Sequence, residues 1–343
     1  MTYKDIQFNF RRTKVMKTKD KQEQDNGEIR KEPDKMNPED LSNYIRSFTH
    51  LFKKKKFEKL SERHEWDHKI NLTEEVPKEL NTKAYAMTLK EEEALNQWLD
   101  EQLKGGLIVE SKSRYTVSCF YILKKDGSLQ LVQDYRKLNK VTIKDKMPLP
   151  LIGEVIDKLK EARYFNKFDL IWGYNNVQIK EGDKWKAVFL TNKGLFEPQV
   201  MYFGLCNSLG IFQRMMNSMF WELLHEGILA NYMDDFVIPA RTKEELEEQM
   251  VRFLKIVEKH NLCFKRLKCD FNIEEIPILG VIVGKGQVKM EQEKIKAVKE
   301  WKKILTRLKD VESFLGFANF YRHFIQNFSH TARPLNELKG KKD

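Results

Sequence analysis

The chain has 343 residues, 41% of them hydrophobic and 33% charged, which is enough apolar sequence for a sizeable core and more than one lobe. Its formal net charge of +11 favours a polyanionic partner, nucleic acid first, although a basic soluble protein without such a partner would carry the same charge. The four cysteines form no C-x-x-C pair and no apolar run approaches ~18 residues, so we expect neither a zinc site nor a membrane partner.

The first forty residues are polar and mixed in charge, without a sustained hydrophobic period. Such a stretch cannot bury enough apolar surface to offset its ordering entropy, so we expect a flexible N-terminal extension. The run Lys53–Lys56 indicates a solvated face, with a phosphate contact as the alternative.

The next elements mix helix and strand without a regular βαβ rhythm. Residues 88–104 predict an amphipathic helix with Leu89, Leu95, Trp98, Leu99 and Leu103 on one side, and Gly105-Gly106 ends it. The dipeptide Asp126-Gly127, between two β-rich runs, predicts a hairpin. Prolines 148 and 150 precede a helix near 151–160, and the short strand that follows ends at Asp169.

The second half continues the mixture. Residues 207–226 predict a helix, ILANYMDDFVIPA predicts two strands joined by a tight turn, and GVIVGKGQVKM predicts another hairpin, after which the chain is helical. Two helices are expected there, with apolar faces formed first by Ile295, Val298, Trp301 and Leu305 and then by Leu308, Val311, Leu315 and Ala318. The fold class is therefore α+β.

The adjacent carboxylates of Asp234 and Asp235 lie at a turn between two apolar strands. Their repulsion would raise a pKa in a partly buried setting, and a hard divalent cation would remove the conflict. Asp169, at the end of another strand, is the natural third ligand. Plain turn chemistry is the alternative for an isolated Asp pair, but the apolar flanks and the second strand-end aspartate favour a metal site.

Several segments, taken in order, resemble the reverse transcriptase of gypsy-type long-terminal-repeat retrotransposons. They are KKDGSLQLVQDYRKLN, PLPLI, FDLIWGYNNVQI, VMYFGLCNS, IFQRMMN, NYMDDFVI, ILGVIV and SFLGFANFYRHFI. The resemblance runs from about residue 48 to residue 343.

The resemblance implies a right-hand polymerase fold with fingers, palm and thumb. The expected bounds are 1–47 for the extension, 48–143 and 177–207 for the fingers, 144–176 and 208–283 for the palm, and 284–343 for a helical thumb. The implied activity is RNA-directed DNA polymerisation on an RNA template and DNA primer duplex, with dNTPs as substrates. The expected location is intracellular, in the cytoplasm (including retroelement particles) or the nucleus. The family's ribonuclease H and integrase are not expected within these 343 residues.

The resemblance also assigns roles to single residues. Asp169, Asp234 and Asp235 would be the catalytic, metal-binding carboxylates, for Mg²⁺ or, as an alternative, Mn²⁺. Tyr174 would exclude a ribose 2′-hydroxyl, with a core tyrosine as the alternative. The other implied contacts are Phe203 and Gly204 lining the nucleotide pocket, Lys124 and Lys125 reaching the triphosphate (or simply solvated), and Lys268 as a proton-donor candidate.

Template–primer contacts are implied for the C-terminal part. Leu279 and Gly280 match a hairpin that steadies the primer end. Gly316, Asn319 and Phe320 match a track in the duplex minor groove, although core packing would explain Phe320 equally well.

The sequence departs from the family at the predicted dNTP site. Gln130 stands where an arginine usually contacts the triphosphate, Leu209 stands where a proline is expected, and Arg114 replaces another proline. These departures favour a second hypothesis, a catalytically impaired or dead remnant that only binds nucleic acid. A nuclease or another magnesium phosphotransferase would share the carboxylates but would not need Tyr174 or a basic helical thumb.

Overall fold

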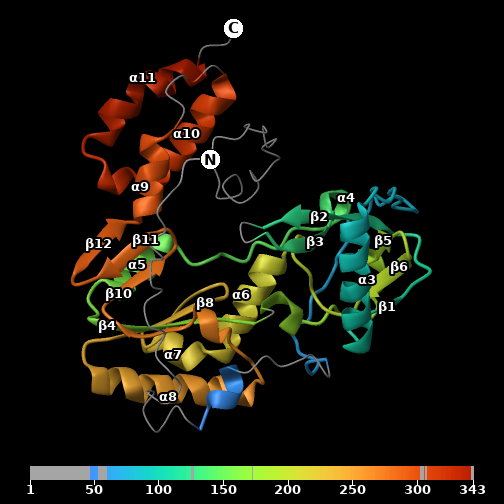
Figure 1. Ribbon diagram of the computed structural model, residues 1–343, viewed down its shortest axis with the longest axis horizontal. Coiled ribbons are helices and arrows are strands. Elements are labelled where there is room, and N and C mark those ends of the chain that lie inside the picture. Colours follow the sequence, from blue (N-terminus) through green and yellow to red (C-terminus); the bar gives the residue numbers. More distant parts are fainter. Residues whose placement is uncertain are drawn as a thin grey trace, which may run out of the picture. The chain divides into compact units, whose positions relative to one another are not determined.

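The computed structural model describes residues 47–52, 60–124, 127–171, 173–301, 305 and 307–340 (Figure 1). The chain divides into two compact units. Of the described residues, those up to Ile276 and Gly284–Gly286 form the larger unit, and Pro277–Val283 and those from Gln287 onward form the smaller. The predicted extension before Ser47 and the Lys53–Lys56 run lie outside the described residues. No described helix is long and apolar enough to cross a membrane.

A five-stranded sheet in the larger unit has the order β1-β6-β5-β2-β3. Its strands are β1 (Ile108–Glu110), β2 (Val117–Leu123), β3 (Leu129–Gln133), β5 (Phe189–Thr191) and β6 (Gly194–Pro198). The predicted hairpin is confirmed as β2–β3, whose antiparallel register ends with Leu123 opposite Leu129. Gly127 in its turn has φ +78°, a left-handed conformation that glycine adopts without strain.

A helix packs on β1 and β3 of this sheet, where one was predicted for residues 88–104. This is α3 (Leu89–Lys104), which begins with a capping box: Thr88 Oγ1 accepts from the Glu91 N–H, and the Glu91 carboxylate accepts from the Thr88 N–H. Gly105 caps its C-terminus. Leu95 and Leu99 are buried as expected. The predicted apolar face is wrong at Leu89 and Leu103, which are exposed because they lie in the terminal turns.

A four-stranded sheet in the larger unit has the order β7-β8-β4-β9. Its strands are β4 (Tyr164–Asp169), β7 (Ala230–Tyr232), β8 (Asp235–Ala240) and β9 (Asp270–Ile273). The helices near it are α5 (Ile152–Leu159), α6 (Ser208–Met219), α7 (Trp221–His225) and α8 (Lys243–Lys259). Helix α8 packs against β4 and β8 along one face of the sheet, and α5 contacts β7 (Figure 1). The strand ending at Asp169 and the two strands around the Asp pair are confirmed.

Phenylalanine rings fill the core between this sheet and its helices. Phe220 is fully buried and packs against Phe253 and Phe236, with ring centroids 5.2 and 5.3 Å apart. The helix predicted for residues 207–226 is confirmed as two helices, α6 and α7, that are separated at Phe220, which has φ −110° and ψ 20°. We attribute the break to the burial of this ring, since no proline or glycine interrupts the sequence there.

The remaining short elements of the larger unit connect these layers. They are η1 (Thr49–Phe52), α4 (Arg136–Val141), η2 (Gly173–Asn176), η3 (Lys184–Ala187) and η4 (Arg266–Lys268).

The third sheet has three strands in the order β10-β11-β12. They are β10 (Glu275–Ile278), β11 (Val281–Gly284) and β12 (Gln287–Met290), and they are followed by α9 (Gln292–Lys299), α10 (Leu308–Phe320), η5 (Arg322–Phe324) and α11 (Phe328–Gly340). The predicted β11–β12 hairpin is confirmed, with positive φ at Lys285 and Gly286 in its turn.

Two expectations for the smaller unit are wrong in detail. The helix predicted to reach residue 305 ends at Lys299, and the Trp301 ring instead packs 5.5 Å from those of Phe314 and Phe317 in α10. Leu308 is half exposed because it is the first residue of α10, whereas Val311, Leu315 and Ala318 are buried as predicted.

Gly280 in the β10–β11 turn permits a close approach that a side chain would block. It has φ +83°, and a Cβ built there would lie 2.7 Å from the Tyr321 hydroxyl oxygen. We expect Gly280→Ala to destabilise the smaller unit by roughly 1–3 kcal/mol through overpacking and backbone strain, measured as a lower midpoint of urea unfolding.

The matched control is Gly286→Ala, which has the same kind of backbone (φ +69°) but no atom within 4 Å of the added Cβ. It should show the backbone strain alone. Because the Tyr321 hydroxyl makes the close contact, Tyr321→Phe should restore part of the stability of Gly280→Ala. Equal losses for the two alanine variants would contradict the steric explanation.

Candidate active site

Three carboxylates, those of Asp169, Asp234 and Asp235, meet where strands of the four-stranded sheet end, and this place is called the acidic edge below. Asp169 ends β4 and is the register partner of Asp235, which begins β8. Asp234 lies in the two-residue turn between β7 and β8, and its carbonyl faces the N–H of Leu170 at 3.4 Å. Strand order therefore brings together aspartates that are 65 residues apart in the chain, from 169 to 234.

The acidic edge carries electrostatic strain. Burial raises the pKa of the Asp234 carboxyl above its ordinary value, and the carboxylates of Asp235 and Asp169 raise it further. A carboxylate is thus held where its charged form is disfavoured, which is typical of functional sites.

Lysines compensate the other two carboxylates. Lys265 Nζ lies 3.0 Å from Asp169 Oδ1, and Lys268 Nζ donates to Asp169 Oδ2 at 3.0 Å. Lys167 Nζ lies 3.4 Å from Asp235 Oδ1. The sequence singled out Lys268 but not Lys265, although the segment FKRLK places the two lysines three residues apart. The Lys265 N–H also donates to the Asp169 carbonyl at 2.9 Å, which ties this segment to the end of β4.

The donor chemistry of this edge fits a hard divalent cation. Carboxylate oxygens are the ligands Mg²⁺ prefers, and the buried Asp169 Oδ1 accepts no aligned hydrogen bond despite its ion pair with Lys265. Across the described part of the chain, however, no three histidine, cysteine or carboxylate side chains already converge on one metal position. Asp169 instead faces two ammonium groups, so a cation there would replace them as its partner.

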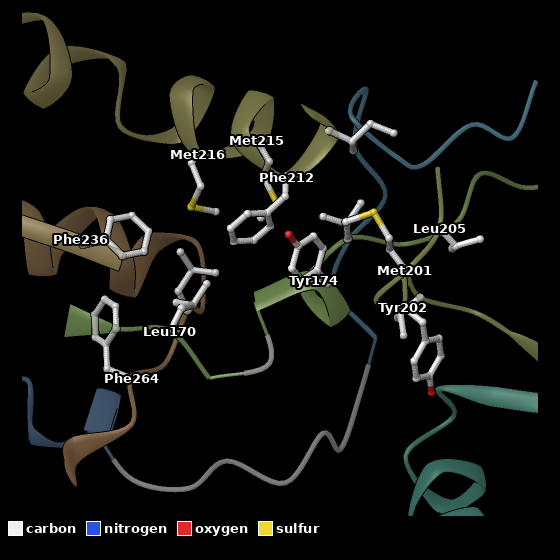
Figure 2. Close-up of a cluster of buried hydrophobic side chains, with 14 of the residues drawn as sticks. Leu170, Tyr174, Met201, Tyr202, Leu205, Phe212, Met215, Met216, Phe236 and Phe264 are labelled. Carbon is white, nitrogen blue, oxygen red and sulfur yellow. The ribbon is translucent and has the colours of Figure 1, made fainter. Parts of the chain in front are cut away.

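Tyr174 lies beside the acidic edge, on η2. Its side chain is 4% exposed and packs against Phe203 and Phe212, with ring centroids 4.4 and 5.1 Å apart. Figure 2 shows it within the buried cluster that includes Leu170, Met215 and Met216. Burial raises the pKa of its hydroxyl and the nearby Asp234 carboxylate adds to the effect.

Gly173, which the sequence did not indicate as a site residue, lets the main chain before Tyr174 lie close to Phe212 and Asp234. A Cβ there would lie 3.3 Å from the Phe212 ring and 3.7 Å from Asp234 Cβ. Tyr174 is therefore both a core residue and a neighbour of the carboxylates, and its role as a sugar gate stays a prediction.

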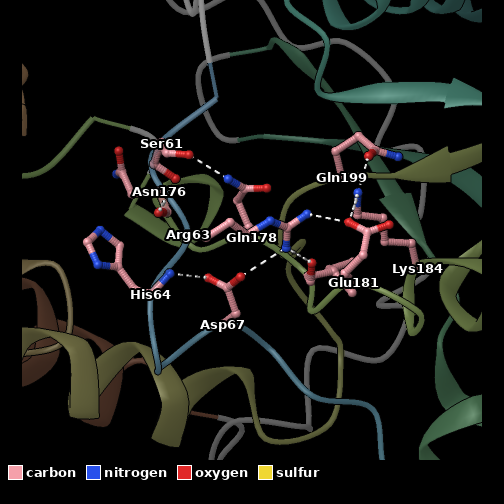
Figure 3. Close-up of polar contacts among 10 residues, drawn as sticks. Ser61, Arg63, His64, Asp67, Asn176, Gln178, Glu181, Lys184 and Gln199 are labelled. Atoms are coloured by element: carbon pink, nitrogen blue, oxygen red, sulfur yellow. Dashed lines mark hydrogen bonds and ion pairs between the residues drawn. The ribbon is translucent and has the colours of Figure 1, made fainter.

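A polar network holds the segment that follows Tyr174 (Figure 3). Ser61 Oγ donates to the Asn176 carbonyl at 3.0 Å. The Arg63 guanidinium donates to the Ile179 carbonyl and to Glu181, both at 2.7 Å. The segment with Ser61 and Arg63 thus holds residues 176–181, which follow η2, although the two segments are more than 110 residues apart in the chain.

The residues predicted to contact dNTP lie on different elements. Phe203 is 54% exposed, and its ring makes a T-shaped contact with that of Tyr174. Gly204 has φ +93°, and its carbonyl accepts a hydrogen bond from Asn139 Nδ2 at 2.7 Å. Gln130 lies in β3 opposite Ile122, and Lys124 is exposed at the end of β2. Lys125 lies outside the described residues.

The predicted template–primer residues belong to the smaller unit. Leu279 and Gly280 form the β10–β11 turn, both with positive φ. The Phe320 ring would lie 3.7 Å from a Cβ at Gly280, so these two predicted contacts meet. Gly316 and Asn319 are exposed on α10.

Known proteins resemble this chain in sequence. A family model described as reverse transcriptase (RNA-dependent DNA polymerase) matches residues 122–283. The retrovirus-related Pol polyprotein from transposon 297 of Drosophila melanogaster is 34% identical over 294 residues, 84% of this chain and 27% of that protein. The transposon Tf2-3 polyprotein of Schizosaccharomyces pombe is 30% identical over 272 residues, 79% of this chain and 20% of that protein. The chain therefore spans about a quarter or less of these relatives.

Solved structures resemble it in fold. The foamy viral protease–reverse transcriptase in complex with dsDNA has a TM-score of 0.77 at 21% identity, covering 89% of this chain and 63% of that one. The same protein in complex with an RNA/DNA hybrid has a TM-score of 0.74 at 21% identity, covering 87% and 40%. The predicted α+β right-hand polymerase fold is confirmed.

Proposed function

The chain belongs to the reverse transcriptase family of retrotransposons, and from this premise we propose that it adds dNTPs to a primer 3′-hydroxyl by two-metal phosphoryl transfer. The observation that carries the proposal is the acidic edge, where Asp169, Asp234 and Asp235 stand on adjacent strand ends. Three carboxylates held together against their repulsion have a clear use as ligands of divalent cations and little use as a stabilising feature.

The three carboxylates would hold Mg²⁺, or Mn²⁺ in its place. The bound ions would activate the 3′-hydroxyl and stabilise the leaving pyrophosphate. The chain's own side chains position the reactants. With a cation bound, Asp169 would lose its lysine partners, and the ammonium groups of Lys265 and Lys268 would then face a polyanionic substrate. Lys268 would thereby be available as the proton donor to pyrophosphate.

An RNA template paired to a DNA primer is the proposed partner. The fold relatives are reverse transcriptases in complex with an RNA/DNA hybrid and with dsDNA. The net charge of +11 favours such a duplex because phosphate-bound counterions are released on binding.

Primer extension tests the proposal directly. The purified chain, a labelled DNA primer on an RNA template, dNTPs and Mg²⁺ or Mn²⁺ should yield extended products, and omission of the metal should abolish them. A chain that binds the duplex but extends nothing with either metal would favour the second candidate, a nucleic-acid-binding remnant. Gln130 at the predicted triphosphate contact is the observation that keeps this candidate open.

Tyr174→Ala tests the predicted selection against ribonucleotides. Removing the ring opens space beside the Phe203 and Phe212 rings without deleting a metal ligand, so incorporation of ribonucleotides should rise at least about tenfold relative to deoxyribonucleotides. The readout is the ratio of kcat/KM for the two nucleotides. Tyr174→Phe is the control, because it keeps the ring and should keep the selection. An unchanged ratio in Tyr174→Ala would leave Tyr174 as a core residue only.

A further inference from the structure

A chain of three side-chain amides surrounds the main chain of Met233, the residue before the Asp pair. Gln213 in α6 is 1% exposed, and its Oε1 accepts from the Met233 N–H at 3.1 Å. Its Nε2 donates to Asn231 Oδ1 at 2.7 Å and to Asn217 Oδ1 at 2.9 Å. Asn231 Nδ2 then donates to the Met233 carbonyl at 2.8 Å.

The orientation of these amides follows from the main chain. Because the Met233 N–H is a donor, it must face the oxygen of Gln213, and because the Met233 carbonyl is an acceptor, it must face the nitrogen of Asn231. The contact between the two side chains is then a matched donor and acceptor. Both polar groups of one residue's backbone are therefore held by two buried side chains.

Met233 is the residue whose backbone needs this support. It has φ +63°, in a two-residue hairpin turn whose first central position favours glycine. A non-glycine residue keeps a left-handed conformation only where its surroundings over-determine it. The next two residues are Asp234 and Asp235, so the angle at Met233 sets the direction in which both carboxylates leave the turn.

We propose that Gln213, together with Asn231, is a positioning pair that fixes Met233 in its left-handed conformation and so preorganises the Asp234 and Asp235 carboxylates for divalent cations. This inference rests on the proposed function for its purpose, but its principal measurement is metal binding, which does not require extension. In the described structure Gln213 and Asn231 form hydrogen bonds with the Met233 main chain and with other amides, so the effect passes through the backbone.

The test compares Mn²⁺ binding to the whole chain by calorimetry. Gln213→Met keeps the length of the side chain and removes all its hydrogen bonds. We expect it to weaken Mn²⁺ binding by about 10–100-fold, the usual effect of losing a partner that orients a ligand. In primer extension, kcat should fall by a similar factor while the duplex Kd stays within about twofold. Asn231→Leu, which loses the donor to the Met233 carbonyl without adding a charge, should act in the same direction.

The matched control is Gln249→Met in α8. Gln249 is a partly buried glutamine whose Nε2 donates along its own helix, to Glu245 at 3.0 Å, so Mn²⁺ affinity should not change. Asn231→Leu separates folding from positioning, since it keeps the Gln213 acceptor for the Met233 N–H and can be judged even where Gln213→Met does not fold. The midpoint of urea unfolding without metal, measured for each variant, shows which of them are folded.

A rescue distinguishes positioning from packing. Glycine adopts positive φ without help, so Met233→Gly placed in the Gln213→Met chain should restore part of the Mn²⁺ affinity. A role in packing alone predicts a further loss. The inference is overturned if the parent chain binds no Mn²⁺, if Gln213→Met binds it as tightly as the parent, or if Met233→Gly gives no recovery. A parent that binds Mn²⁺ but extends no primer contradicts the proposed function while the positioning pair is still judged by affinity.

Discussion

Asp234→Asn is expected to lower primer extension by several orders of magnitude while the affinity for duplex stays the same or rises slightly. The amide is a poor ligand for a hard cation, and in the proposed site the three carboxylates would share their ions, so losing one should disable the site rather than weaken it. Duplex affinity does not fall because the substitution removes a negative charge near a polyanion. Steady-state kinetics on a primed RNA template and a filter-binding titration measure the two effects.

The same variant should unfold at a higher temperature than the parent when no metal is present. Asp234 is a partly buried carboxyl with a raised pKa beside two like charges, and the neutral amide removes both the desolvation and the repulsion. Asp169→Asn should do the opposite, because it leaves Lys265 and Lys268 without their shared anion.

Asp157→Asn is the control. Its carboxylate is 68% exposed and pairs only with Lys160 in the described structure, so neither extension nor stability should change much. Extension by Asp234→Asn at the parental rate would remove Asp234 from the proposed metal site.

Local signals in the sequence predicted most of the elements. The Asp126-Gly127 turn and the Gly105-Gly106 helix end each specify a conformation within a few residues, and the structure has a hairpin and a helix end there. The acidic edge was also predictable. A strand that ends in aspartate and an Asp pair between two apolar strands place carboxylates at strand ends, whichever residues of the strands pair with one another.

The features that were missed depend on contacts between distant residues. The break at Phe220 follows from its packing against Phe236 on β8 and Phe253 on α8. No proline or glycine nearby in the sequence indicates it. Gln213 looks like an ordinary polar helix position until its neighbours Asn231 and Met233 are known. Lys265 becomes relevant only because its segment lies against the end of β4, 96 residues earlier in the chain (from 169 to 265).

The lysines at the acidic edge also explain how the fold tolerates these carboxylates without metal. Two ammonium groups at 3.0 Å balance Asp169, and Lys167 lies 3.4 Å from Asp235, while burial and its neighbours raise the pKa of Asp234. The electrostatic conflict is therefore concentrated on one side chain, and that side chain follows the residue held by Gln213 and Asn231.

Gln130→Arg is expected to lower the apparent KM for dNTP by about tenfold or more and to leave duplex affinity nearly unchanged. A charge-assisted hydrogen bond to phosphate is about twice as strong as a neutral one. The missing charged partner therefore corresponds to about 1.5–3 kcal/mol, and about 1.4 kcal/mol is a tenfold change in binding. Gln130 lies in β3 of the β2–β3 hairpin, whose turn carries the lysines predicted to reach the triphosphate. The readout is KM for dNTP in primer extension beside duplex Kd.

Leu209→Pro should raise the gain further when it is combined with Gln130→Arg. Leu209 is the second residue of α6, where a backbone N–H has no partner within the helix and proline is tolerated. The start of this helix otherwise depends on Asn207, which has φ +69° and whose side chain donates to the Ile143 carbonyl at 2.8 Å. If both residues border one nucleotide pocket, their effects should couple rather than add.

A parent chain that already extends primers at low dNTP concentration, with no gain from Gln130→Arg, would instead assign the triphosphate to Lys124 or Lys125. The remnant hypothesis would then lose its best support, because the departure at Gln130 would have no consequence for catalysis.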